Sequence, residues 1–136
     1  MAKSGDNPPA IHSIRLRGPA WLIGSDADQK ECSRSRIKTP CDIEIADRDD
    51  ELRYSVQRSF GSPTGLEEQQ KVEMHFSEFK NAVTILINGA AVSGKEVAIE
   101  KSFRIDVTEI LKERNTLAVV FEMPGRFGEV ELQIPN

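Results

Sequence analysis

The sequence contains few of the residues that build catalytic and metal centres. Its 136 residues include two histidines, two cysteines, one tryptophan and one tyrosine. His12 and His75 do not stand at the spacing of a Ser-His-Asp, Cys-His or HExxH arrangement. Cys32 and Cys41 match neither a zinc site nor a CxxC pair. These absences leave no motif for catalysis, so we expect a protein without enzyme activity.

Long apolar runs and a basic surplus are missing as well. No stretch approaches the roughly 18 consecutive apolar residues of a membrane span, and residues 1–9 lack the apolar segment of a signal peptide. The 18 basic residues are outnumbered by 22 acidic ones, for a net charge of −4, whereas nucleic-acid-binding domains usually carry a basic surplus. We therefore expect neither a membrane nor a nucleic acid as partner. The chain as written is expected to be cytoplasmic, with export open if a leader was removed.

The two cysteines are expected to be free thiols in a reducing compartment. Cys41 lies in the segment Thr39-Pro-Cys-Asp-Ile and is expected to act as a small apolar residue, as free cysteine often does. A disulfide with Cys32 is the alternative if the protein is exported, and the sequence does not decide between the two.

What the sequence has in quantity is two-residue periodicity. Successive side chains of a β-strand point to opposite faces, so alternation of apolar and polar residues predicts a strand with one buried face. About eight short strands are expected, separated by turn signals roughly every 8–12 residues, as is typical of antiparallel sandwiches and barrels. Seven segments show the alternation clearly, with the apolar residues Ile14 and Leu16; Leu52, Tyr54 and Val56; Val72, Met74 and Phe76; Val83, Ile85 and Ile87; Phe103, Ile105 and Val107; Leu117, Val119 and Phe121; and Val130, Leu132 and Ile134.

The expected fold class is therefore all-β, an antiparallel β-sandwich. We expect residues 1–10 to be a flexible lead-in and residues 11–136 to form a single sandwich domain, since no composition shift marks a boundary inside them. Residues 108–114 are expected to form at most one helical turn.

Residues that favour turns separate several of the predicted strands. Asn88-Gly89 predicts a tight hairpin, because both residues tolerate positive φ. Pro124-Gly125 is expected to turn the chain. Pro40 interrupts a short strand and places it at a sheet edge. The basic stretch 30–38, with four cations and no aromatic residue, is expected to be a solvated edge strand rather than a track for phosphates.

Several motifs follow one another in a recognisable order. They are Ile14-Arg-Leu-Arg-Gly-Pro-Ala-Trp21, Ser35-Arg-Ile-Lys-Thr-Pro40, Tyr54-Ser-Val-Gln-Arg-Ser-Phe60, the segment 74–89 ending in Asn-Gly, and the segment 103–117 with Asp-Val-Thr, Leu-Lys and Asn-Thr-Leu. This order resembles the N-terminal sugar-binding domain of family 2 glycoside hydrolases, the group of β-galactosidases, β-glucuronidases and β-mannosidases. The resemblance spans roughly residues 14–121 and implies a jelly-roll, galactose-binding-like sandwich.

The resemblance implies binding rather than hydrolysis. The catalytic glutamates of that family lie in a separate barrel domain, for which 136 residues leave no room. The stretch after Asn88-Gly89 also lacks the loop rich in glycine and aromatic residues often found there. We therefore expect a non-catalytic module that binds a carbohydrate or small polar ligand. The alternative is a structural or protein–protein interaction domain with no sugar binding.

Sugar sites usually combine an apolar platform with a few polar groups. Trp21 follows a turn and is either such a platform or, as we favour, a plug in the core. Phe127, which follows Arg126 after the expected turn, is the best exposed-aromatic candidate. The predicted ligand-binding residues are therefore Trp21, Arg126 and Phe127.

His75 and two acidic clusters are expected to have structural roles only. His75 alternates with Met74 and Phe76, so we expect it on the solvent side of its strand. The acidic clusters at Asp26 and Asp28 and at residues 47–51 are expected to be solvated turns, and we expect no cofactor. A structural calcium ion is the alternative, because calcium takes carboxylate and carbonyl oxygens and the resemblance implies a sandwich type that often holds one.

Overall fold

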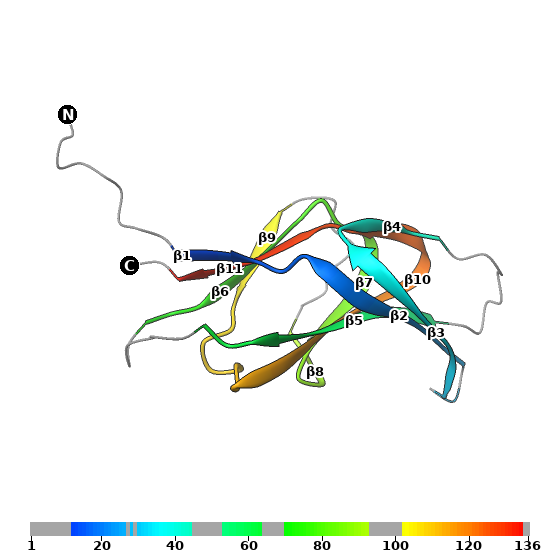
Figure 1. Cartoon of the computed structure of the whole chain (residues 1–136), viewed down its shortest axis with the longest axis horizontal. Coiled ribbons are helices and arrows are strands. Elements are labelled where there is room, and N and C mark those ends of the chain that lie inside the picture. The colour runs from blue at the N-terminus through cyan, green and yellow to red at the C-terminus, as the bar shows by residue number, and fades with distance from the viewer. Residues whose placement is uncertain are drawn as a thin grey trace.

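The computed structural model describes residues 12–26, 28, 30–44, 53–63, 70–92 and 102–134, with the backbone alone for His12 and Phe103. All regular structure in these ranges is β-strand, arranged as two layers (Figure 1). Within them no helix has the length and apolar character needed to span a membrane. The antiparallel β-sandwich predicted from two-residue periodicity is confirmed, and so is the jelly-roll type that the family resemblance implies.

The strands form two sheets in which every pairing is antiparallel. The four-stranded sheet runs in the order β1 (His12–Arg15), β11 (Glu129–Ile134), β6 (Glu73–Ser77) and β9 (Phe103–Asp106). The seven-stranded sheet runs in the order β3 (Glu31–Thr39), β2 (Gly18–Ser25), β5 (Arg53–Gly61), β10 (Arg114–Phe127), β7 (Lys80–Ile87) and β8 (Ala90–Ala91), and β4 (Cys41–Ile43) also pairs with β10.

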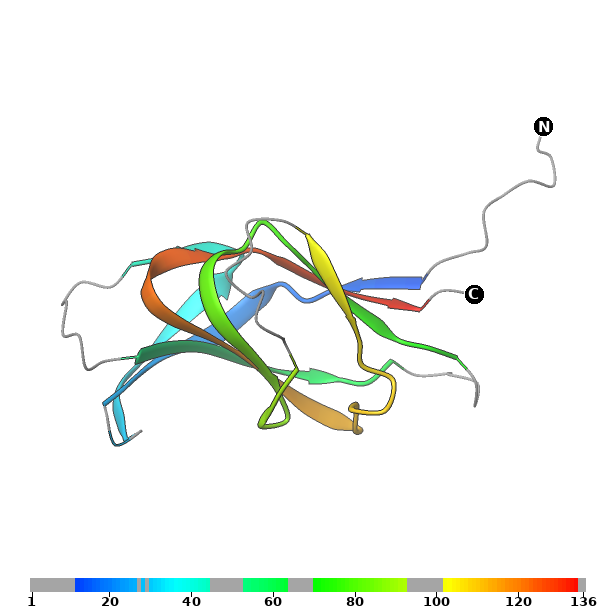
Figure 2. The same cartoon turned by 180° about the vertical axis from the view of Figure 1, so that it is seen from behind.

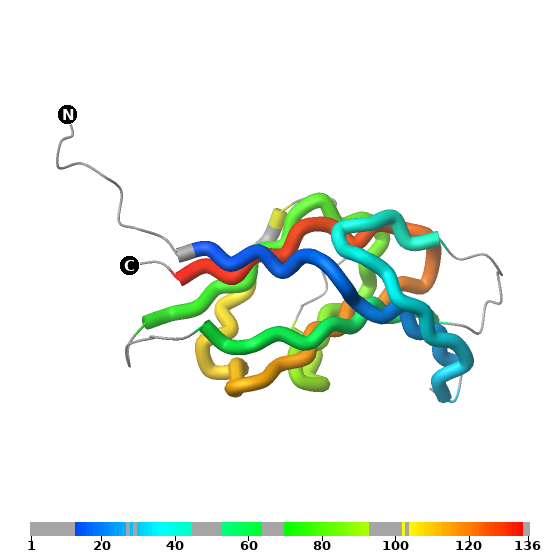
Figure 3. The backbone as a smooth tube through the Cα atoms, in the orientation of Figure 1, coloured from blue at the N-terminus to red at the C-terminus, as the bar shows by residue number. Residues whose placement is uncertain are grey.

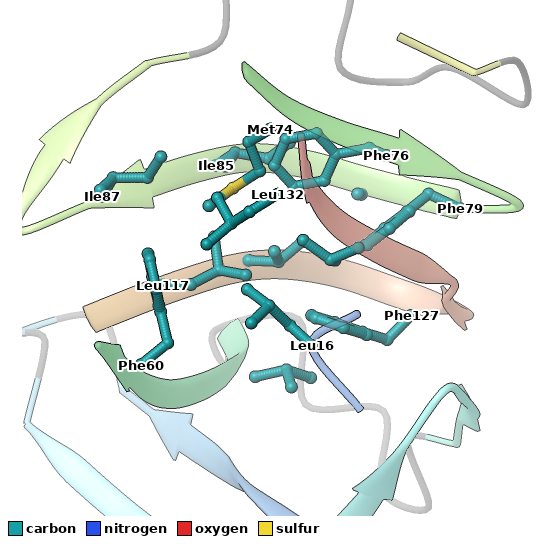
Figure 4. Packing of buried hydrophobic residues seen from close by; sticks show 14 of the residues in the cluster. Leu16, Phe60, Met74, Phe76, Phe79, Ile85, Ile87, Leu117, Phe127 and Leu132 are labelled. Atoms are coloured by element: carbon teal, nitrogen blue, oxygen red, sulfur yellow. The ribbon is translucent and has the colours of Figure 1, made fainter. Parts of the chain in front are cut away.

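The inner faces of the two sheets enclose one apolar core (Figure 4). Leu132 and Met74 are register partners on β11 and β6, and both are at most 1% exposed. From the opposite sheet, Val56, Val119 and Ile85 form a fully buried row across β5, β10 and β7. The alternating apolar residues of β6, β10 and β11 thus point inward, as their spacing predicts.

Strand β10 continues through Pro124-Gly125, where a turn was expected. The structure places both residues inside the 14-residue β10, between Phe121 and Arg126, where the register with β7 shifts. The side-chain amide of Asn81 donates to the carbonyl of Pro124 at 2.7 Å and holds this irregular stretch. A Cβ at Gly125 would overlap the carbonyl oxygen of Lys80. The dipeptide therefore allows β10 to pass close to the backbone of Lys80 on β7. β10 is curled here, as Figure 2 shows from behind.

The Asn88-Gly89 hairpin forms as predicted. The two residues connect β7 to β8 with φ values of 54° and 84°, which is the backbone that this dipeptide favours. The Asn88 side chain also connects the turn to the start of β10. Its amide donates to Asn115 Oδ1 at 2.9 Å, and its Oδ1 accepts from the N–H of Thr116 at 3.0 Å.

The segment after β9 forms a single helical turn, as expected, because the N–H groups of Ile110 and Leu111 donate to the carbonyl of Val107 at 3.0 and 3.1 Å. Asp106 Oδ1 accepts from the N–H of Thr108 at 3.0 Å and from its hydroxyl at 2.6 Å. Asn115 closes the segment, since its Oδ1 accepts from the N–H of Lys112 at 2.8 Å. These motif residues act as architectural devices.

The edge-strand interpretation of the basic stretch is confirmed. β3 lies at the border of the seven-stranded sheet, and its residues 31–36 are all exposed. Pro40 separates β3 from β4, so the chain leaves this edge there. Cys32 and Cys41 are free thiols; Cys41 is half-buried against the core, and this burial raises its pKa.

Candidate ligand-binding site

Trp21 lies on the outer face of the seven-stranded sheet. The neighbouring Ala20 and Leu22 face the core, so alternation along β2 turns Trp21 outward and leaves it half-buried. The guanidinium carbons of Arg34 and Arg36 lie 5.1 and 5.2 Å from the centre of its ring. The expectation of a core plug is therefore wrong, and the ring is covered by two cations.

Phe127 is fully buried, so the expectation of an exposed aromatic residue at this position is wrong. Its ring packs 4.8 Å from that of Phe79 (Figure 4). The physical reason is that β10 continues past Pro124-Gly125 and pairs Phe127 with Cys41 of β4. The residue is thereby part of the core.

Arg126 is half-buried and pairs with Asp42 of β4, with 3.0 Å between Nη1 and Oδ1. Trp21 is in register with Gln57 of β5, and so with Ala118 of β10. Arg126 lies on the far side of the β10 irregularity from Ala118. The structure therefore does not bring the three predicted residues into one site, and ligand contacts at Trp21 and Arg126 stay predictions.

A pocket that was not predicted lies on the outer face of the four-stranded sheet. Its volume is about 450 Å³, and it is lined by His75, Phe76, Ser77, Ser102, Arg104, Glu131 and Gln133. The antiparallel register sets Glu131 opposite His75, and His75 opposite Arg104. Three strands distant in sequence thus contribute one cross-strand row of ionisable side chains.

Glu131 supplies the negative charge of this row. The Ser13 hydroxyl hydrogen-bonds to its carboxylate and lowers its pKa, against the opposing effect of burial. The amide of Gln133 donates to Oε1 at 3.2 Å and acts in the same direction. Glu131 is therefore a carboxylate at neutral pH, with hydrogen-bond acceptors at the pocket wall.

Arg104 supplies the donors, and His75 lies between it and Glu131. Arg104 is exposed on the edge strand β9 and forms no ion pair or hydrogen bond through its guanidinium with any described residue. His75 Nε2 lies 3.7 Å from Glu73 Oε1, too far for a hydrogen bond, and has no other partner in the described part of the chain. Among the described residues the guanidinium of Arg104 therefore has no partner that a ligand would have to displace, and the imidazole Nε2 of His75 has no hydrogen bond.

The acidic turn at Asp26 has a structural role. Its Oδ1 accepts from the N–H groups of Asp28 and Lys30, both at 2.9 Å. Across the described ranges, no three histidine, cysteine or acidic residues gather as a metal site would require. Residues 47–51 lie outside the described residues, and a structural calcium ion stays a prediction.

Known proteins match this chain in structure but not in sequence. No family model matches the sequence, and no curated protein matches it. Solved structures do match: β-glucuronidase from Bifidobacterium dentium, complexed with coumarin-3-O-glucuronide, has a TM-score of 0.71 at 18% identity over 96% of this chain. The chain shares its fold with part of that enzyme.

Two further enzymes show the same likeness. A β-glucuronidase from an uncultured Clostridium sp. has a TM-score of 0.68 at 17% identity over 99% of the chain. A β-D-mannosidase from Dictyoglomus thermophilum has a TM-score of 0.64 at 12% identity over 81%. The resemblance to family 2 glycoside hydrolases is thus confirmed for the fold. The jelly-roll spans only 31%, 30% and 15% of these three chains.

Proposed function

We propose that this chain is a non-catalytic binding module whose pocket on the four-stranded sheet holds a hydroxyl-rich ligand of the carbohydrate class. The observation that carries the proposal is the row formed by Glu131, His75 and Arg104. A sugar hydroxyl both donates and accepts hydrogen bonds. The carboxylate of Glu131 accepts from such a group, while the guanidinium of Arg104, which has no partner among the described residues, donates to its neighbour.

The size and polarity of the pocket support this proposal. Its volume of about 450 Å³ lies within the range of roughly 300–1,000 Å³ usual for small-molecule sites. The hydroxyls of Ser77 and Ser102 add groups that both donate and accept. The side chain of Phe76 is fully buried, so this residue offers no stacking platform. Polar contacts therefore carry the recognition, and we expect millimolar rather than micromolar affinity.

The same groups are poorly suited to hydrolysis. A glycosidase needs a carboxylic acid whose pKa is raised, so that it can protonate the leaving oxygen. The pKa of Glu131 is instead lowered by its hydrogen bond from Ser13. The likeness to glycosidases also covers about 30% of the two β-glucuronidase chains. We therefore assign this site to binding.

The test is calorimetry and a glycan array on the wild type and two matched variants. Arg104→Ala is expected to weaken binding by about tenfold or more, since a hydrogen bond from a charged donor contributes roughly 1.5–3 kcal/mol. Arg114→Ala removes an equally exposed arginine at the start of β10 and is expected to leave affinity unchanged. The absence of binding to any glycan at millimolar concentration would discard the proposal.

A protein-interaction domain is the second candidate function. The specific observation that favours it lies on the other sheet, where Trp21 and the long strand β3 form an exposed, charged border. That surface is independent of the pocket.

A further inference from the structure

The exposed borders of the two sheets differ in length. β3 is an edge strand of nine residues, whereas the other edge strands of the described chain, β1, β4, β9 and β8, have four, three, four and two. An edge strand turns half of its backbone N–H and C=O groups towards solvent, where they can pair with a further strand. The length of β3 therefore makes it the best-suited of these edges for strand addition.

The side chains of β3 make this border basic. Arg34, Arg36 and Lys38 alternate along the strand and share the outer face with Trp21. Arg34 is bonded to Glu31, with Nη2–Oε1 and Nε–Oε2 distances of 2.7 and 3.2 Å. Arg36 and Lys38 form no ion pair within the described residues. Within the part of the chain that the structure describes, two positive charges thus remain uncompensated along the edge.

Trp21 orders these cations. The guanidinium groups of Arg34 and Arg36 lie about equally far from the indole ring, at 5.1 and 5.2 Å. Such contacts are worth roughly 0.5–1 kcal/mol at an exposed site. They hold two long side chains in place before a partner arrives, which reduces the conformational entropy lost on binding.

We propose that the β3 edge binds an extended acidic segment of a partner polypeptide, which adds to the seven-stranded sheet as a further strand. Backbone pairing along β3 supplies the affinity, and acidic residues at alternate positions meet the cations. A second copy of β3 is a poor occupant, because pairing would set like charges against each other. This inference concerns a protein partner and goes beyond the carbohydrate proposal.

The test uses three short peptides with blocked termini and the whole protein. The first alternates glutamate with threonine, the second lysine with threonine, and the third is the acidic peptide N-methylated at every second amide. Calorimetry measures affinity, and the fluorescence of Trp21, the only tryptophan, reports the location. We expect the acidic peptide to bind and change the fluorescence, and the other two to bind at least about tenfold more weakly.

Matched charge variants locate the contact. Arg36→Glu with Lys38→Glu is expected to weaken binding of the acidic peptide by about tenfold or more, because attraction becomes repulsion. Lys112→Glu with Arg114→Glu makes the same change of charge at exposed residues away from β3 and is expected to leave affinity within about twofold. A milder pair, Arg36→Gln with Lys38→Gln, serves if the reversed pair fails to fold.

Several results would overturn the inference. Equal binding of the N-methylated peptide would show attraction of charge without strand pairing. Equal binding of the basic peptide, or equal effects of the two variant pairs, would remove the role of the β3 cations. No binding at millimolar peptide would remove the site. Each of these outcomes is independent of sugar binding at Arg104, so the two proposals fail separately.

Discussion

At the scale of single residues, Phe127 shows how strongly its neighbours decide a side chain's role. A phenylalanine between Arg126 and Gly128 has the local sequence of an exposed loop residue, yet it is fully buried against Phe79. The apolar character of Phe127 is evident from the sequence, but its pairing with the strand β4, which covers it, is not. Its burial depends on pairing with residue 41, which is far away along the chain.

Truncating this ring tests its place in the core. Phe127→Ala is expected to lower the free energy of unfolding by about 3–5 kcal/mol, because it removes buried apolar area and leaves a cavity. Phe127→Leu keeps most of the volume and is expected to cost less than half as much. Urea denaturation followed by circular dichroism measures both. A change below about 1 kcal/mol for the alanine variant would contradict the buried position.

At the scale of elements, the sequence predicts strands well wherever alternation is uninterrupted. Met74 and Phe76 on β6, and Leu117 and Val119 on β10, are buried as their spacing requires. Val83 breaks the pattern: it is 37% exposed although it alternates with Ile85 and Ile87. The register shift beside Val120 pairs Thr84 with Val120 but Ala82 with Phe121, so Ala82 takes the inner position. A β-bulge changes which residues of a strand face the core, and residue types alone do not show where a bulge occurs.

The candidate pocket could be predicted only in part. The position of His75 between Met74 and Phe76 correctly indicates a strand residue on the outer face. Its neighbours Glu131 and Arg104 come from strands that are distant in sequence. Periodicity assigns each residue to a face but leaves open which strands lie side by side, so the row becomes visible only when the strand order is known.

Gly125 gives a test of the β10 irregularity. Gly125→Ala is expected to destabilise the fold by about 1–3 kcal/mol, because the new Cβ would overlap the backbone of Lys80 and the strands must separate. Gly61→Ala is the matched control on β5, where the nearest atom to a Cβ, Glu113 O, lies 3.9 Å away. Thermal denaturation compares the two variants. Equal melting temperatures would mean that β10 does not approach Lys80 so closely.

At the scale of the whole molecule, carboxylates on both ends of the four-stranded sheet stabilise the fold in a pH-dependent way. The pKa of Glu129 is lowered by a bidentate bond from Arg17, with N–O distances of 3.0 and 2.8 Å, and that of Asp106 by the hydroxyl and N–H of Thr108. Glu131 behaves alike through Ser13. A lowered pKa means that the folded state favours the charged form, so these contacts stabilise the protein above the ordinary carboxyl pKa.

We therefore expect stability to fall as the pH drops below about 4.5, the ordinary value for glutamate, and through the lowered pKa values. The urea midpoint measured between pH 7 and pH 2.5 follows this loss. Glu129→Gln is expected to flatten the acid limb, while Glu113→Gln, which removes an exposed carboxylate with no ion pair among the described residues, leaves it unchanged. Identical acid limbs for Glu129→Gln and the wild type would contradict this assignment.

The first and last described strands meet at one border of the sandwich. His12 is the register partner of Ile134, and Figure 3 shows β1 and β11 running side by side from the same end. Tension applied through these two ends would pull an antiparallel pair apart from its open end, breaking its hydrogen bonds one after another rather than loading them together. The protein is accordingly built to yield at low force along this axis, and β1 would peel away before the layers separate.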